Sequence, residues 1–149
     1  MNFPSKTVSH SPTMTIDELY EEFDFLADWD DQCDFLIDLG FELPTLPDEK
    51  KTEENRVHGC QSQVWLVATV TNGKPPKVEF LANSDAIIVN GLIAVLRILY
   101  NGKTPDEILS IDAKDVFKRL GLERHVSPQR RNGLYGMVER IRQFATSAA

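Results

Sequence analysis

The fold that we predict is built around the segment RVHGCQSQVWLVATV, residues 56–70. Its second half belongs to a strand that we predict over residues 63–71, because apolar side chains fall there on every second position. The turn signal Asn72-Gly73 and the alternating run 77–82 predict a hairpin with a return strand. Residues 56–58 are a candidate short edge strand. We therefore expect an α+β fold, with a small antiparallel sheet of about three strands packed against several helices.

Capping residues mark the starts of several helices. Residues 15–18 read Thr-Ile-Asp-Glu, a capping box, and apolar residues then recur at helical spacing. Asp28 is expected to cap a second helix that ends at Gly40 as a C′ residue. Residues 104–107 form another capping box, and Asp112 is expected to cap a further short helix.

Two longer helices are predicted in the second half of the chain. Residues 86–100 are apolar on nearly every side, which predicts a buried central helix, and Gly91 permits a close approach to a neighbour. Ser84 and Asp85 are expected to cap this helix. The last helix is expected over residues 127–144. Its inward face carries Leu134, Met137, Val138 and Ile141.

The composition indicates one acidic globular domain. The 149 residues carry 16 Lys and Arg against 23 Asp and Glu, a formal net charge of -7. This charge disfavours nucleic acid and anionic membrane surfaces as partners and fits a protein that binds other proteins. We expect a flexible tail over residues 1–14 and a single domain over residues 15–149. Without a signal peptide or an apolar run long enough to span a bilayer, the expected location is cytoplasmic.

The two cysteines, Cys33 and Cys60, are expected to be free thiols in the reducing cytosol. Two thiols and three histidines, without a CxxC motif, provide few metal ligands, so we expect no metal site, iron–sulfur cluster or other cofactor. Cys33 lies between Asp31 and Asp34. Because nearby carboxylates raise the pKa of a thiol, we interpret Cys33 as incidental.

Cys60 lies in a short polar turn, GCQS, directly before the predicted strand. A free cysteine is most often buried and inert. Here Gly59 allows a sharp turn and the following residues are polar, which favours a thiol displayed on a loop. His58 would project to the same side of an extended segment and could withdraw the thiol proton. A plain surface histidine is the alternative interpretation.

Arg130 is expected in the first turn of the last helix, where a cation opposes the helix dipole. An anionic partner would offset the unfavourable interaction of the arginine with the helix dipole. Asp85 is one candidate partner. A cysteine thiolate is a second, and the arginine would then lower the pKa of that thiol. A solvated arginine is the simple alternative.

Taken together, these motifs resemble the SufE family of sulfur acceptors. The resemblance covers nearly the whole chain, from about Thr15 to Phe144. It is carried by WDDQCDFLIDLG (29–40), LPTLP (43–47), GCQSQVWL (59–66), SDAIIVNGLIAVLRILYNGKTPDEI (84–108) and SPQRRNGL (127–134).

The resemblance implies a fold similar to NifU-type iron–sulfur scaffolds without their metal ligands. It implies that Cys60 accepts sulfane sulfur from a pyridoxal-phosphate cysteine desulfurase of the SufS type and passes it to the SufBCD scaffold complex. Asp85 and Arg130 match family positions in the network around the acceptor loop. His125 matches a family position to which we assign no role, and Cys33 has no family counterpart. The oligomeric state stays open, a homodimer included.

Three rival interpretations remain at this point. A SufE-like carrier could serve another desulfurase and feed a different sulfur-transfer pathway. A regulator without its own chemistry could bind the desulfurase and activate it allosterically. An independent thiol enzyme such as a peroxidase is disfavoured, because the sequence indicates neither a resolving cysteine near Cys60 nor a group that orients a base. The resemblance itself favours a transpersulfuration partner over a stand-alone enzyme.

Overall fold

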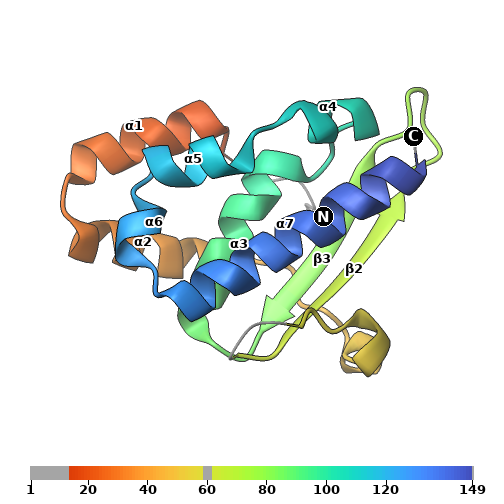
Figure 1. The fold of residues 1–149 in the computed structure, drawn as a ribbon, viewed down its shortest axis with the longest axis horizontal. Coiled ribbons are helices and arrows are strands. Elements are labelled where there is room, and N and C mark those ends of the chain that lie inside the picture. The colour runs from red at the N-terminus through yellow and green to blue at the C-terminus, as the bar shows by residue number, and fades with distance from the viewer. Residues whose placement is uncertain (1–13, 59–61, 149) are drawn as a thin grey trace, which may run out of the picture.

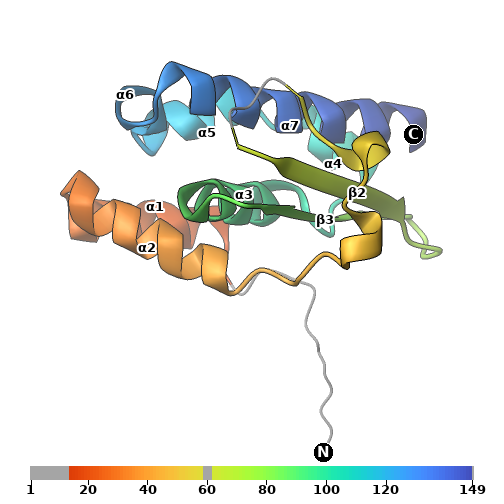
Figure 2. The same ribbon diagram turned by 90° about the horizontal axis from the view of Figure 1, so that it is seen from below.

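A computed structural model describes residues 14–58 and 62–148 of the chain. This part contains seven α-helices, two short 3-10 turns and one two-stranded sheet, which confirms the predicted α+β class. Figure 2 shows α3 (Ile87–Tyr100) and the strands in the middle of the molecule, with α7 (Pro128–Ala148) on one side and α2 (Trp29–Phe41) on the other. No helix in the described residues is long and apolar enough to cross a bilayer.

The sheet is a hairpin of β2 (Val64–Val70) and β3 (Val78–Ser84), paired antiparallel from Val64↔Ser84 to Val70↔Val78. Both strands were predicted. The third strand expected at residues 56–58 is wrong, because only one isolated bridge joins Arg56 to Trp65. The 3-10 turn η2 (Glu53–Asn55) ends immediately before Arg56. The amide and the carbonyl oxygen of Gln63 bond Asp85 rather than this segment, so the pairing does not continue past the start of β2.

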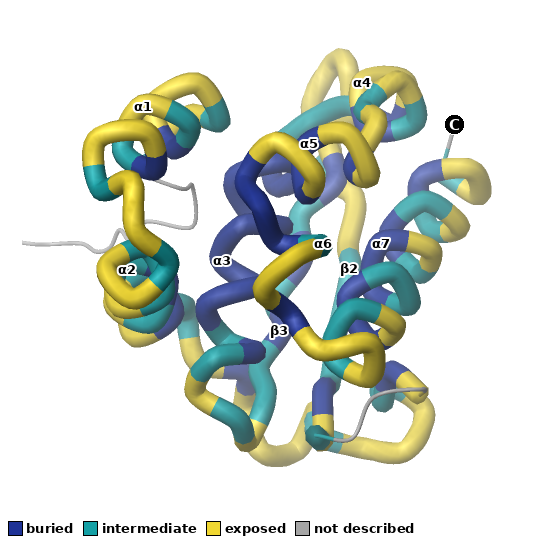
Figure 3. The backbone as a smooth tube through the Cα atoms, turned by 60° about the vertical axis from the view of Figure 1, so that its left-hand side comes forward, coloured by how far each residue is buried: buried dark blue, intermediate teal, exposed yellow. Residues whose placement is uncertain are grey.

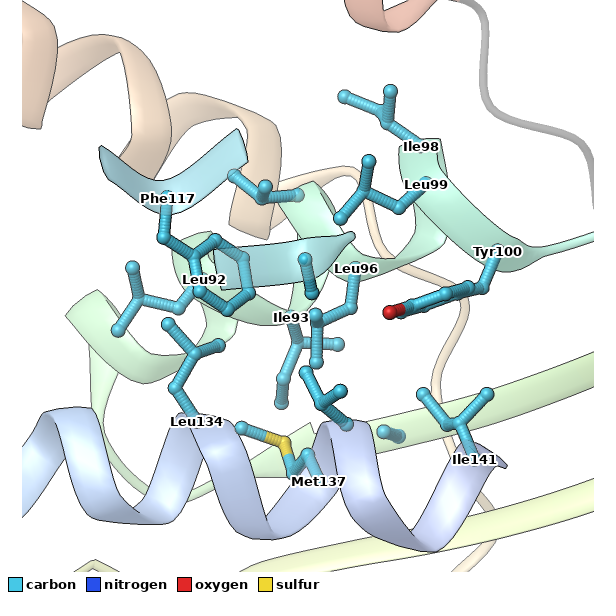
Figure 4. Packing of buried hydrophobic residues seen from close by; sticks show 14 of the residues in the cluster. Leu92, Ile93, Leu96, Ile98, Leu99, Tyr100, Phe117, Leu134, Met137 and Ile141 are labelled. Atoms are coloured by element: carbon cyan, nitrogen blue, oxygen red, sulfur yellow. The ribbon is translucent and has the colours of Figure 1, made fainter. Parts of the chain in front are cut away.

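The helix α3 is the buried centre of the fold, as predicted. Eleven of its residues are buried (Figure 3), and its side chains pack against those of α5 (Ala113–Arg119) and α7 (Figure 4). Packing on several faces at once explains why the helix is apolar nearly all round.

Two glycines let α2 and α3 approach each other closely. A Cβ atom added at Gly91 would lie 2.7 Å from the carbonyl oxygen of Leu36, and one at Gly40 would lie 2.7 Å from the amide nitrogen of Gly91. The close approach expected at Gly91 is therefore confirmed. The prediction that Gly40 ends α2 is wrong, since the helix continues through Phe41 and Gly40 serves its packing.

Local capping follows the sequence closely. Thr15 and Glu18 form the capping box of α1 (Ile16–Leu26), and Asp28 caps α2. Thr104 and Glu107 form the capping box of α4 (Pro105–Ser110). Asp112 caps α5, as predicted.

After the short α6 (Leu122–His125), α7 begins and runs beyond the predicted end at residue 144. Its buried face includes the predicted residues Leu134, Met137, Val138 and Ile141.

The charged segment before the hairpin is tied to α7. Residues 48–55 contain the 3-10 turns η1 (Asp48–Lys50) and η2. Arg140 of α7 donates hydrogen bonds to the carbonyl oxygens of Glu54 (2.7 Å) and Arg56 (2.8 Å). These bonds fasten the chain that leads into the GCQS segment to the long C-terminal helix.

Candidate functional site

The described residues of the predicted site lie at one end of the molecule. The N-terminal ends of β2, α3 and α7 are found together there (Figure 1). Asp85 lies just before α3, and Arg130 lies in the first turn of α7. Cys60 and Gly59 lie outside the described residues. The flanking residues, His58 and Ser62, are described and define where this segment leaves and re-enters the fold.

Asp85 does not cap α3 as predicted. The N-cap position is Ala86, which makes no side-chain capping bond. Instead, the Asp85 carboxylate oxygen Oδ1 accepts a hydrogen bond from the amide of Gln63 (3.0 Å), and the Asp85 amide donates to the Gln63 carbonyl oxygen (3.2 Å). Asp85 therefore holds the residue that stands three positions after Cys60 in the chain.

Ser84 also differs from the prediction, because β3 extends as far as this residue. Its Oγ accepts a bond from the Ala86 amide (3.1 Å). Asn90 then bonds the Ser84 backbone twice, accepting from its amide (2.8 Å) and donating to its carbonyl oxygen (3.0 Å). The junction between β3 and α3 is thus fixed by an asparagine inside the helix, which leaves the Asp85 carboxylate to bond Gln63.

His58 is exposed and lies beside a carboxylate. Its Nε2 is 2.8 Å from Oε2 of Glu53 in η2. The sequence did not indicate any group that orients His58. The structure corrects this, because it places the Glu53 carboxylate beside the ring. A carboxylate that holds one imidazole nitrogen fixes the orientation of the ring for proton transfer at the other.

Arg130 lies half-buried in the first turn of α7, and its backbone amide is 3.3 Å from Ser127 Oγ. Its guanidinium nitrogen Nη1 is buried and has no hydrogen-bond partner among the described residues. The Asp85 carboxylate bonds Gln63, and the two predicted site residues form no ion pair with each other within the described chain. Because an unpaired buried donor costs about 1–3 kcal/mol, Arg130 is suited to receive an anion.

Cys33 and His125 lie outside this arrangement. Cys33 is half-buried on α2, and burial raises the pKa of its thiol, with further contributions from Asp34 and Asp30. The direction of this shift was predicted from the neighbouring carboxylates. The His125 ring stacks on Trp29, with the ring centroids 4.7 Å apart and the planes 5° from parallel. This contact joins α6 to the start of α2.

The described residues contain no group of three or more His, Cys, Asp or Glu side chains placed to hold a metal ion.

Sequence reasoning missed three residues that shape the site: Gln63, Glu53 and Arg140. Gln63 acts through its backbone, so its side chain carried no signal. Glu53 lies within the charged run 48–55, whose pattern indicates no site. Arg140 lies 84 positions after its partner Arg56, and no local pattern links the two.

Three comparisons with known proteins bear on this arrangement. The family model described as "SufE: Fe-S metabolism associated domain" matches residues 17–145. An uncharacterized SufE-like protein of Rhizobium etli is 47% identical over 133 residues, which cover 88% of this chain and 89% of the relative. An uncharacterized SufE-like protein of Rhizobium meliloti is 43% identical over 132 residues, which cover 88% of this chain and 94% of the relative.

A solved structure supports the architecture. The solution structure of a hypothetical protein from Thermus thermophilus superposes with a TM-score of 0.72 at 24% identity. The superposition covers 91% of this chain and 98% of that one. At this identity the likeness concerns the fold alone.

Proposed function

The chain belongs to the SufE family, whose domain is associated with iron–sulfur metabolism, and we propose that Cys60 is its sulfur acceptor. The donor in this proposal is the persulfide of a pyridoxal-phosphate cysteine desulfurase of the SufS type. The recipient is the SufBCD scaffold complex, for iron–sulfur cluster assembly. The observation that carries the proposal is the family match over residues 17–145, which spans the GCQS segment and the residues placed around it.

The proposed step is an attack of thiolate on persulfide, analogous to thiol–disulfide exchange. The Cys60 thiolate attacks the outer sulfur of the desulfurase cysteine persulfide and forms a new S–S bond. The S–S bond within the donor persulfide breaks, and the donor cysteine leaves as a thiolate. The outer sulfur moves from one cysteine to the other, so the step needs no external oxidant or reductant.

Thiolate supply limits such a step, since an ordinary thiol is only a few per cent ionised at neutral pH. Arg130 supports the proposal because its guanidinium carries a buried nitrogen without a hydrogen bond among the described residues. A cation beside a thiol lowers the thiol pKa and raises the thiolate fraction. We assign Arg130 the role of stabilising the Cys60 thiolate.

His58 is proposed as the first acceptor of the thiol proton. It stands two residues before Cys60, and Glu53 at 2.8 Å orients its ring. Asp85 is proposed as a positioning residue, since it holds Gln63 and thereby one end of the acceptor segment. Removal of either side chain should slow sulfur uptake less than removal of the Cys60 thiol.

An assay of desulfurase stimulation tests the proposal against its nearest rival. The desulfurase is supplied with cysteine and a reductant, and alanine and sulfide formation are followed with and without this protein. We expect the Cys60→Ser variant to bind the desulfurase but to lose the stimulation of turnover. A Cys33→Ser variant is the matched control and should stimulate normally. Full stimulation by Cys60→Ser would instead indicate an allosteric activator that acts by binding alone.

The choice of partner is tested in the same way. Pull-downs with desulfurases of different types should retain the SufS type, and sulfur should then move from this protein to SufBCD. Retention of another desulfurase alone would indicate a carrier for a different sulfur-transfer pathway. We place the protein in the cytoplasm in this proposal, where these partners would meet it.

A further inference from the structure

A cavity of about 520 Å³ lies between the α4–α5 connection and α7. It adjoins Tyr100 at the C-terminal end of α3, whereas Asp85 precedes the N-terminal end of the same helix. The cavity is thus separated from the proposed sulfur site by the length of α3, about 20 Å for a helix of this size. Its volume lies within the range of about 300–1,000 Å³ that is usual for small-molecule sites.

Tyr100 lines this cavity and carries a hydroxyl group without a partner in the described chain. The residue is fully buried, and its hydroxyl has no hydrogen-bond partner among the described residues. Figure 4 shows the ring lying between α3 and α7. Burial raises the pKa of Tyr100 to about 12, with smaller opposing effects of Arg142 and Asp112, which both line the cavity. At neutral pH the hydroxyl therefore keeps its proton and remains a buried, unsatisfied donor near these two charged groups.

Arg142 brings a positive charge to the same wall. Its Nη1 is 3.2 Å from the carbonyl oxygen of Leu109, and it forms no ion pair within the described part of the chain. A guanidinium carries five N–H donors, so most of them remain available. Lys114 adds a second positive charge at the rim, while Asp112 is engaged as the cap of α5. An anionic group therefore fits this end of the cavity.

The rest of the lining is mainly apolar. Leu109, Ile111 and Val138 form the wall, and Tyr135 completes it with a hydroxyl that already donates to Glu123 Oε2 (2.7 Å).

We propose that this cavity binds a small carboxylate with an apolar body. The carboxylate would lie against the Arg142 guanidinium and the Tyr100 hydroxyl, and the body would lie against the apolar wall. This inference does not depend on the proposed sulfur chemistry.

A titration of the full chain with sodium octanoate, followed by amide NMR, tests the proposal. We expect saturable shifts of the amides at residues 109–114 and 138–142. The neutral analogue 1-octanol should bind about tenfold more weakly or worse, since it lacks the charge that strengthens a hydrogen bond to Arg142. Equal binding of octanol, or shifts confined to other parts of the chain, would overturn the proposal, and so would the absence of saturable shifts.

A pair of tyrosine variants separates ligand binding from folding. Tyr100→Phe should leave the melting temperature of the free protein unchanged or raised, because it removes an unsatisfied buried group, while octanoate affinity falls about tenfold. Tyr135→Phe is the matched control, and it should lower the melting temperature and keep the affinity. A lower melting temperature with undiminished octanoate binding in Tyr100→Phe would show that the hydroxyl serves the fold, and would overturn the proposal.

A pair of charge variants gives a second, independent test. Arg142→Gln should weaken octanoate binding about tenfold and bring its affinity close to that of 1-octanol. Lys118→Gln removes the same charge from the last turn of α5 and lies outside the cavity lining, so its octanoate affinity should be unchanged. Equal losses in the two variants would indicate a general effect of net charge and would contradict a site at Arg142.

Discussion

Asp85 and Gln63 are joined by two hydrogen bonds, one from the Gln63 amide to Asp85 Oδ1 (3.0 Å) and one from the Asp85 amide to the Gln63 carbonyl oxygen (3.2 Å). The pair connects the chain just before α3 to the chain just before β2. It therefore fixes the C-terminal side of the segment that contains Cys60. On the other side, Val57 donates to the carbonyl oxygen of Val64 (2.9 Å), so both ends of the segment are held beside the start of β2.

The substitution Asp85→Ala tests the importance of this pair. It removes the side-chain acceptor of the Gln63 amide, so we expect a loss of about 1 kcal/mol in the free energy of unfolding. Hydrogen exchange at the Gln63 amide should become faster than in the unmodified protein. Asp38→Ala is the control, since Asp38 is an exposed aspartate without a side-chain hydrogen bond to the described residues. Unchanged exchange at Gln63 would contradict the assigned contact.

The substitution Arg130→Met tests the role of the buried guanidinium. Methionine keeps most of the apolar stem and removes a nitrogen that lacks a partner, so the free energy of unfolding should change by less than about 1 kcal/mol. Sulfur uptake at neutral pH should fall about tenfold, as for a thiol pKa that rises by roughly one unit. Uptake should recover as the pH is raised.

Arg124→Met, at an exposed position on α6, is the control for Arg130→Met and should leave uptake unchanged. A tenfold loss that does not recover at high pH would argue against stabilisation of a thiolate. A large loss of stability in Arg130→Met would show instead that the guanidinium serves the fold.

Two glycine-to-alanine substitutions should have opposite effects on stability. In Gly91→Ala the new Cβ would lie 2.7 Å from the Leu36 carbonyl oxygen and 2.9 Å from its carbon, so α2 must move. We expect a loss of about 2 kcal/mol. In Gly136→Ala the nearest atom is 3.5 Å away, an ordinary contact, and alanine should stabilise α7 by about 0.5–1 kcal/mol. Urea denaturation measures both, and equal effects would contradict the close packing of α2 on α3.

The thiol of Cys33 should react slowly with alkylating reagents. Burial, followed by the charges of Asp34 and Asp30, raises its pKa, so less thiolate is present at a given pH than in an unfolded chain. In the Cys60→Ser variant the alkylation rate should therefore reach half its maximum at a higher pH in the folded protein than in urea. Identical pH profiles in the two states would contradict the environment assigned to Cys33.

Features of the fold that depend on neighbouring residues were predicted correctly. Alternation over seven residues defines β2, and the capping boxes at Thr15 and Thr104 each lie within four positions. The central helix was predicted because its apolar surface runs nearly all round. These signals are local, since the direction of side chains repeats every few residues and a capping box spans only a few positions.

The errors concern contacts between distant segments. Asp85 was expected to cap α3, a local role, but its partner Gln63 lies 22 positions earlier. Gly40 was interpreted as a helix end because glycine is common there, whereas it serves a contact with Gly91 of another helix. The expected strand at residues 56–58 is wrong because one bridge joins this segment to β2, and the backbone of Gln63 bonds the distant Asp85 instead.

The candidate site residues remain predictions. The sequence indicated His58, Asp85 and Arg130, and the resemblance gave Cys60 its role. It did not reveal the contact between His58 and Glu53, or the guanidinium nitrogen of Arg130 that lacks a partner in the described chain. Both features depend on how the chain packs around these side chains, which no spacing encodes.

Intact mass spectrometry after incubation with a cysteine desulfurase of the SufS type, pyridoxal phosphate and cysteine tests whether Cys60 accepts sulfur. Peptide mapping would then locate any added sulfur. We predict an adduct of one sulfur atom on Cys60, absent from Cys60→Ser and retained in Cys33→Ser. If Cys60 carries no sulfur under conditions in which the desulfurase itself holds a persulfide, the protein is not a sulfur acceptor for that enzyme.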